Sequence, residues 1–169
     1  MKGSFPALQR YGVYLAALIV VLADQSSKYL VQSLVPLHHS IPVIEGFFNI
    51  TYVRNPGAAF GLLAQAGPAW RLFFLVAVSL VFMSALVIYL ERNRDRTGKI
   101  LYVSFALILG GAAGNLIDRI IHGEVVDFLD LYIKSLHWPA FNLADSAISI
   151  GVFLLLIDVI LHRDSPPAR

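Results

Sequence analysis

Four apolar stretches, each long enough to cross a bilayer, limit what this chain can fold into more than any other feature of the sequence. A membrane-spanning helix needs roughly 20 mostly apolar residues. The stretches cover residues 13–34, 72–90, 100–120 and 141–161. With 57% apolar and only 14% charged residues, the chain is also far too apolar for a water-exposed domain of its size. The sequence therefore predicts an all-α membrane protein of four transmembrane helices, forming one domain over residues 1–169.

Basic residues are distributed unevenly along these spans. Eight of the 13 Lys and Arg residues precede the first span, lie between the second and the third, or follow the fourth. Since Lys and Arg collect on the cytoplasmic side of membrane proteins, we expect both termini in the cytoplasm and residues 35–70 and 121–140 outside. The basic residues form no single patch, so no nucleic acid partner is expected. The eight residues on the expected cytoplasmic side are Lys2, Arg10, Arg92, Arg94, Arg96, Lys99, Arg163 and Arg169.

The first apolar stretch follows two basic residues, as the apolar part of a cleaved signal peptide does. It resumes beyond Asp24 through residues 29–35, so we interpret it as a spanning helix that is retained. In the loop that follows, residues 47–53 alternate and are rich in aromatic and β-branched side chains, which predicts a short strand on the membrane surface. The expected fold thus includes a small extracytoplasmic β-rich element between helices one and two.

The unusual polar residues gather near the outer ends of the expected spans and in the outer loops. Ionisable groups within a span cost on the order of 3 kcal/mol each, so they usually face the interior of a helix bundle and mark function. The unusual polar residues are Asp24, Lys28, Asn55, Asn115, Asp118, Arg119, Asp127 and Asp145.

Two rows of residues recur every four positions along the third span. One row combines a glycine, an amide and a cation. The other consists of small residues suited to close helix packing, so the polar row beside it is expected to face the interior of the bundle. The rows are Gly111, Asn115 and Arg119, and Ala106, Gly110 and Gly114.

Some of these residues have simpler interpretations. Asp24 and Lys28 are four residues apart on one helical face and can form an ion pair with a purely structural role. Pro56 favours an extended Asn55, and Gly57 permits a close turn, so the Asn55 amide can be aimed at a ligand. An ordinary turn asparagine is the alternative.

Two carboxyl groups held close together share a proton, so that one can activate water while the other polarises a carbonyl. Asp127 lies in the apolar run 125–128, and Asp145 follows the segment 141–144. Apolar surroundings at a membrane surface favour one protonated partner, which is the chemistry of aspartic peptidases. A helix cap is the alternative role for Asp145.

Other chemistries fit the sequence less well. Neighbouring helical residues point apart, which argues against a dyad of Ser27 and Lys28. The chain has no cysteine, so thiolate catalysis and disulfides are excluded. A metal site remains a weaker alternative because no His-Glu-x-x-His spacing occurs, and Asp130 and Lys134 are expected to be solvated. The candidate ligands would be His38, His39, His122, His137, Glu124, Asp127 and Asp130.

Five blocks in order along nearly the whole chain resemble the lipoprotein signal peptidase family, also called signal peptidase II. The family consists of aspartic peptidases of bacterial lipoprotein maturation. The blocks are residues 24–28 (DQSSK), 55–60 (NPGAAF), 110–119 (GGAAGNLIDR), 125–128 (VVDF) and 141–146 (FNLADS).

The resemblance implies that Asp127 and Asp145 are the catalytic dyad of a metal-free, cofactor-free endopeptidase. It implies substrates that are diacylglyceryl-modified prolipoproteins, cut just before the lipidated cysteine. It also implies contact with membrane lipids, action as a monomer and a location in the bacterial cytoplasmic (inner) membrane with the active site on the extracytoplasmic face. Residues 129–139 show no pattern of the family. Residues implied to bind substrate or support the site are Asp24, Lys28, Asn55, Gly111, Asn115, Arg119 and Asn142.

Two other functions remain open from the sequence alone. A small transporter or proton channel would use Asp24, Lys28, Asp118 and Arg119 as a charge relay, but the inner halves of the second and third spans are apolar apart from a few serines. A non-enzymatic lipid-binding assembly factor would use the same outer cavity. Metal-free cleavage of a lipidated peptide would exclude both.

Overall fold

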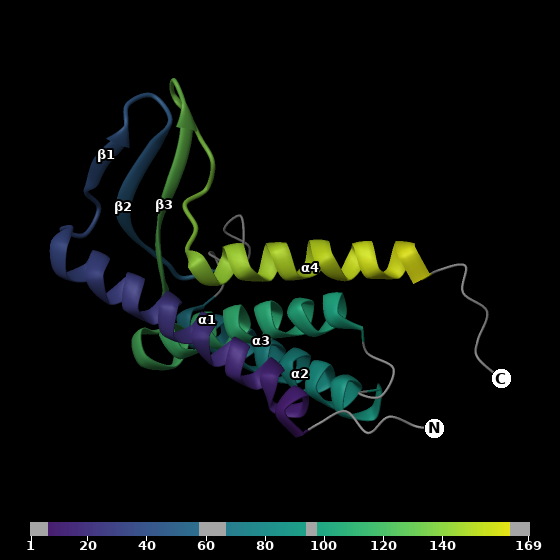
Figure 1. The fold of residues 1–169 in the computed structure, drawn as a ribbon. Helices are drawn as coiled ribbons and strands as arrows, with labels where there is room; N and C mark the ends of the chain where they lie inside the picture. Colours follow the sequence, from purple (N-terminus) through teal and green to yellow (C-terminus); the bar gives the residue numbers. More distant parts are fainter. Residues whose placement is uncertain (1–6, 58–66, 94–97, 163–169) are drawn as a thin grey trace, which may run out of the picture.

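The computed structural model describes residues 7–57, 67–93 and 98–162 and contains four long helices. They are α1 (Ala7–Leu34), α2 (Pro68–Asn93), α3 (Lys99–His122) and α4 (Leu143–His162) (Figure 1). Each is long and apolar enough to cross a membrane. The predicted four-helix membrane fold is therefore confirmed, with helices longer at several ends than the apolar stretches alone indicated.

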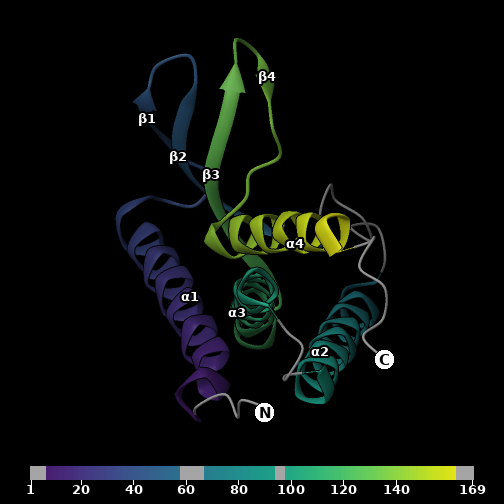
Figure 2. The ribbon, with the colours of Figure 1, turned by 45° about the vertical axis from the view of Figure 1, so that its right-hand side comes forward.

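Helix α3 lies at the centre of the bundle, with α1, α2 and α4 around it (Figure 2). Glycines on α3 allow this close packing. A Cβ added at Gly110 would lie 2.6 Å from Val20 Cβ on α1, and one at Gly111 would collide with the carbonyl oxygen of Ala144 on α4. The predicted small-residue ridge thus faces α1, whereas Gly111 is the contact point with α4.

A four-stranded antiparallel sheet extends from one end of the bundle (Figure 1). Its strands, in spatial order, are β1 (Ser40–Ile44), β2 (Phe48–Asn55), β3 (Val125–Ile133) and β4 (Leu136–His137). The strand predicted near residues 47–53 is present as β2. The sheet is larger than the predicted element, however, because β3 and β4 come from the segment between α3 and α4.

Buried apolar side chains attach the sheet to the C-terminal end of α1. Val31 of α1 and Val35, which directly follows the helix, pack with Tyr52 of β2 and with Val126 and Phe128 of β3. The two faces of β3 are therefore used differently. Val126 and Phe128 face α1, while residue 127 between them points to the opposite face of the sheet.

The start of α4 also differs from the predicted boundary. Phe141, expected at the beginning of the fourth span, forms a bridge with Leu129 of β3 instead. The helix begins at Leu143, directly after Asn142. Because the Phe141 backbone pairs with β3, the start of α4 is held beside the strand that carries Asp127.

A candidate active site where the sheet meets the helices

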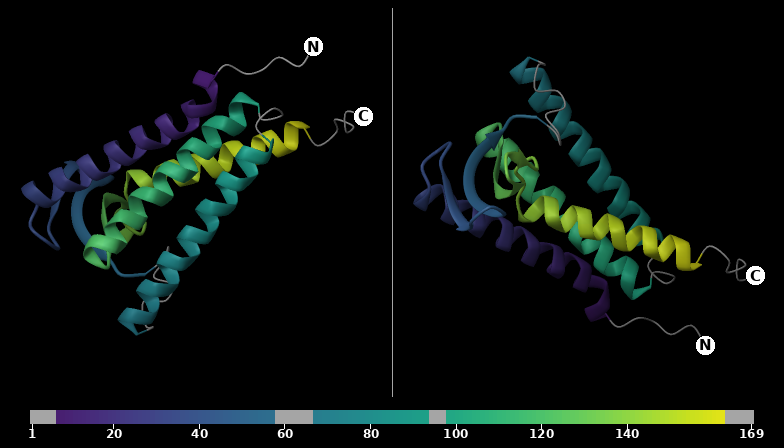
Figure 3. Two further views of the ribbon diagram at one scale, coloured as in Figure 1. Left: turned by 90° about the horizontal axis from the view of Figure 1, so that it is seen from below. Right: turned by 90° about the horizontal axis from the view of Figure 1, so that it is seen from above.

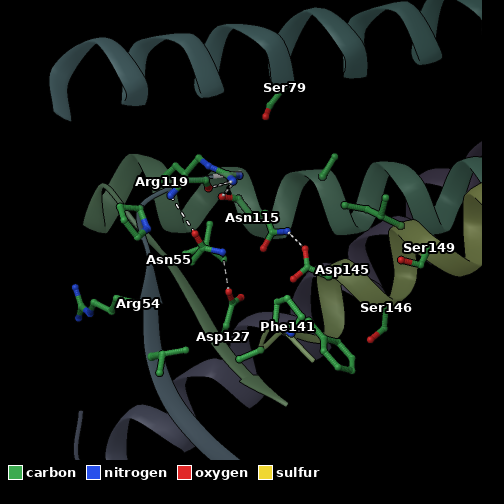
Figure 4. Close-up of a pocket in the computed structure, with 18 of the residues that line it drawn as sticks. Arg54, Asn55, Ser79, Asn115, Arg119, Asp127, Phe141, Asp145, Ser146 and Ser149 are labelled. Atoms are coloured by element: carbon green, nitrogen blue, oxygen red, sulfur yellow. Dashed lines mark hydrogen bonds between the residues drawn. The ribbon is translucent and has the colours of Figure 1, made fainter. Parts of the chain in front are cut away.

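A cavity of about 1060 Å³ lies where the sheet meets the helices. It is lined by side chains from β2, β3, α2, α3 and α4, together with the segment 138–141 that leads into α4. Both candidate aspartates line it, as do three of the predicted supporting residues, Asn55, Asn115 and Arg119 (Figure 4). Residues from four of the five sequence motifs therefore meet in one place.

Asp127 projects from β3 and is almost completely buried, with 2% of its surface exposed. Its Oδ2 accepts a hydrogen bond from Asn55 Nδ2 (3.0 Å), and its Oδ1 accepts one from Asn142 Nδ2 (2.7 Å). Burial raises the pKa of Asp127 to about 7, and the neighbouring charge of Asp145 adds to the rise. The amide hydrogen bonds from Asn55 and Asn142 act in the opposite direction.

Asp145 lies in the first turn of α4, where it completes a reciprocal cap with Asn142. The Asp145 backbone N–H donates to Asn142 Oδ1 (2.9 Å), and the Asn142 backbone N–H donates to Asp145 Oδ2 (3.2 Å). The residue at the N-cap position is therefore Asn142, and Asp145 takes part in the cap from the first turn of the helix. Asp145 keeps Oδ1 for the side-chain amide of Asn115, at 2.7 Å, and lines the cavity.

Asn142 joins the two aspartates. Its side chain is fully buried and bonds to Asp127 through Nδ2 and to the Asp145 backbone through Oδ1. In Figure 4, the Asp127 and Asp145 side chains project from different elements into the same space, below Asn115. Two carboxyl groups that are distant in sequence are thus brought to one cavity by strand β3 and the capped start of α4.

A buried ion cluster of Lys28, Asp24 and Asp118 lies next to the cavity. Lys28, with 1% of its surface exposed, places Nζ 2.8 Å from Asp24 Oδ2, 2.9 Å from Asp118 Oδ2 and 3.1 Å from Asn115 Oδ1. The predicted Asp24–Lys28 pair is present, but Asp118 of α3 joins it.

Two carboxylates of this ion cluster accept hydrogen bonds from backbone N–H groups near the site. Asp24 Oδ1 accepts the Ala144 N–H (2.9 Å), and Asp118 Oδ2 accepts the Val126 N–H (3.0 Å). The cluster therefore fixes α1, α3, β3 and α4 relative to one another. Neither Asp24 nor Lys28 lines the cavity.

Asn55 and Arg119 hold the turn at the end of β2. The Gly57 N–H donates to Asn55 Oδ1 (3.0 Å), which leaves the Asn55 amide nitrogen for Asp127. Arg119 donates to the Gly57 carbonyl and to the Asn115 carbonyl, both at 3.3 Å. Asn55 is therefore more than an ordinary turn residue. Residues 58–60 of the second sequence motif lie outside the described residues.

Two residues near the site have supporting roles although they are not among the residues predicted to bind substrate or support the site. Asp118 joins the ion cluster, and Gln25 Nε2 donates to Asp118 Oδ1 at 2.8 Å. A signal for both was available, because Gln25 adjoins Asp24 and both residues lie in motifs of the family. Gly111, in contrast, contributes close packing against α4 rather than a polar group.

The expectation that Asp130 is solvated is wrong. Only 7% of its surface is exposed, and its carboxylate accepts Asn49 Nδ2 (2.8 Å) and lies 2.8 Å from His137 Nδ1. Pairing of β3 with β2 and β4 encloses it, which the sequence did not indicate. Within residues 7–57, 67–93 and 98–162, no three candidate metal ligands gather into a group that could hold an ion.

Helices that can span a membrane and two carboxyl groups in a shared cavity are the features expected of a membrane aspartic peptidase. The family model described as Signal peptidase (SPase) II matches residues 16–161. The chain belongs to this family, and the transporter and assembly-factor alternatives are set aside.

Individual relatives agree with the family model. A lipoprotein signal peptidase of Syntrophus aciditrophicus (strain SB) is 54% identical over 142 residues, covering 84% of this chain and 88% of the relative. One of Geobacter metallireducens is 48% identical over 155 residues, covering 92% and 93%. A solved bacterial membrane enzyme, 34% identical, superposes with a TM-score of 0.80 over 94% of this chain and 93% of its own.

Proposed function

We propose that Asp127 and Asp145 are the catalytic pair with which this signal peptidase cuts diacylglyceryl-modified prolipoproteins before the lipidated cysteine. One observation carries the proposal: both carboxyl groups line one cavity and are bonded to the same residue, Asn142. Each also accepts a second amide, from Asn55 or from Asn115. The pair is held rigidly, as positioned acid and base groups require.

The chemistry needs one protonated and one ionised carboxyl group. The ionised group takes a proton from water as the water oxygen attacks the scissile carbonyl carbon, and the protonated group donates to the carbonyl oxygen. When the tetrahedral intermediate collapses, the C–N bond breaks and the leaving nitrogen takes the proton that the first group had removed from water. The former carbonyl oxygen returns its proton to the second group, which restores the pair. The products are a signal peptide with a new carboxylate and a lipoprotein with a free amino group on its cysteine.

The cavity suits a substrate that is partly embedded in the bilayer. It extends between α2 and α4, where Val78, Phe82 and Ile148 provide apolar walls. Near the sheet it is polar, with Asn55 and Arg119. We assign the apolar part to the acyl chains and the signal segment, and the polar part to the backbone around the scissile bond.

We further propose that the site faces the extracytoplasmic side of the bacterial cytoplasmic (inner) membrane. Four spans return the chain to its starting side, and the beginning of α1 and the end of α4 lie at the end of the bundle opposite the sheet (Figure 3). Described basic residues Arg92 and Lys99 lie at that same end, whereas several others in the charge argument fall outside the described residues. The chain is proposed to act as a monomer without a cofactor, in contact with membrane lipids.

Expression of variants in cells that lack their own lipoprotein signal peptidase tests this function. Asp127→Asn and Asp145→Asn should insert normally but let the lipidated precursor accumulate. Asp130→Asn is the matched control, because Asp130 is a buried carboxylate on the same strand that bonds Asn49 and His137 instead. Normal processing by either of the first two variants would overturn the assignment.

A further inference from the structure

Lys28 determines which way the side-chain amide of Asn115 faces. An ammonium group has only donors, so the Asn115 atom 3.1 Å from Lys28 Nζ must be the oxygen. Asn142 Nδ2 donates to the same oxygen at 3.2 Å. The Asn115 amide nitrogen is therefore directed at Asp145, which it reaches at 2.7 Å.

Two donors and a helix N-terminus favour the ionised form of Asp145, against the desolvation that its partial burial imposes. It accepts two donors, the Asn115 amide and the Asn142 backbone N–H, and the latter cannot rotate away. It also lies in the first turn of α4, where the partial positive charge of a helix N-terminus stabilises an anion. Asp127 also accepts two donors, but it lies in the middle of a strand without a helix terminus and is the more deeply buried of the two.

We propose that Lys28 is a positioning residue that acts through Asn115 to keep Asp145 ionised, so that the proton of the pair rests on Asp127. The proposal rests on the proposed function and deepens it. Asp145 is then the base that takes the proton from water, and Asp127 is the acid that donates to the carbonyl oxygen. The raised pKa of Asp127, caused mainly by burial, agrees with this assignment.

Lys28 acts on Asp145 by orienting the Asn115 amide more than by its own positive charge. Its positive charge is opposed by the two carboxylates of Asp24 and Asp118, so the ion cluster has a formal charge of −1. The other charged groups near Asp145 are Asp127 of β3 and Arg119 of α3. The part of α2 that lines the cavity supplies only Val78, Ser79 and Phe82.

A charge-matched double variant isolates the orienting effect. Lys28→Met with Asp118→Asn leaves Asp24 as the only ionised member, so the formal charge of the ion cluster stays at −1. Of the two donors to the Asn115 oxygen only Asn142 Nδ2 then remains, at 3.2 Å, so the amide can turn its oxygen to Asp145 more easily, which favours protonation of Asp145. The acidic limb of kcat/KM against pH should move about one pH unit upward, which is about a tenfold loss at any pH on the steep part of the limb.

Asn115→Leu removes the donor directly and should move the acidic limb by a similar amount. Adding it to the double variant should give no further movement, because the two changes interrupt one path. Lys28→Arg retains a donor and should restore most of the wild-type profile. The proposal is overturned if the double variant keeps the acidic limb at its wild-type position. It is also overturned if the shifts caused by Asn115→Leu and by the double variant add up when the changes are combined.

Infrared spectroscopy of unreacted enzyme gives a readout that needs no turnover. At pH 6, the carbonyl band of a protonated carboxyl group should disappear in Asp127→Asn and persist in Asp145→Asn. The reverse pattern would refute the assignment of the proton while leaving the catalytic pair intact. Failure of the proposed function itself gives a different result, since both of these variants would then still cleave substrate.

Discussion

Removal of the Asn55 side chain should move the alkaline limb of the activity profile upward. Because the pKa of Asp127 is raised to about 7, the protonated form that the reaction needs is fully present well below pH 7 and is lost as pH rises through about 7. Asn55 Nδ2, 3.0 Å from Asp127 Oδ2, favours the ionised form. Asn55→Ala removes that bond, so protonated Asp127 persists to higher pH.

The size of the effect follows from the kind of bond. A hydrogen bond to a charged group is worth about 1.5–3 kcal/mol when it is made in a folded protein. At 1.36 kcal/mol per pK unit, complete loss would move the alkaline limb by about 1–2 pH units. We expect about one unit, because the cavity gives water access to the vacated position.

The assay is kcat/KM of purified enzyme on a lipidated peptide between pH 5 and 10. Asn49→Ala is the matched control, since Asn49 on the same strand donates an equivalent bond of 2.8 Å to Asp130. The control should keep the alkaline limb near pH 7. The reasoning is refuted if Asn55→Ala leaves that limb in place or moves it downward.

Three further changes have defined outcomes. Gly111→Val would drive a side chain into the Ala144 carbonyl and should cost about 1–3 kcal/mol of stability, whereas Gly12→Ala meets nothing within 4 Å and should leave the unfolding temperature in detergent unchanged or slightly raised. Lys28→Met alone leaves Asp24 and Asp118 without their cation and should destabilise the protein by about 3–5 kcal/mol, measured as thermal unfolding in detergent. Cleavage should continue in excess chelator, because the carboxyl groups of the pair are occupied by amide donors; complete inhibition that added metal reverses would contradict this.

The spanning helices were predictable because the hydrophobic thickness of a membrane sets the required length, and hydropathy along the sequence reports it directly. The distribution of Lys and Arg then indicates which ends of the helices share a side of the membrane. For the same reason the candidate site was predictable as a region: Asp127, Asp145 and Asn55 had to lie near one interface.

The remaining features depend on contacts between distant residues. Strand β3 pairs with β2 across about 75 residues of sequence, and its mixed apolar pattern gives no clean alternation, so the full sheet and the burial of Asp130 could not be inferred. The double role of Asn142, as helix cap and as partner of Asp127, depends on that pairing. Asp118 joins the ion cluster only because α1 packs closely against α3.

Single-turnover cleavage of a defined diacylglyceryl peptide by purified variants tests the central claim most directly. Asp127→Asn and Asp145→Asn should each lose about 10³-fold or more in rate, and the double variant should be no worse than the slower single variant, because the two groups act as a unit. Asp130→Asn should cleave at close to the wild-type rate. A rate near that of wild type for either of the first two variants, or losses that multiply in the double variant, would contradict a catalytic pair.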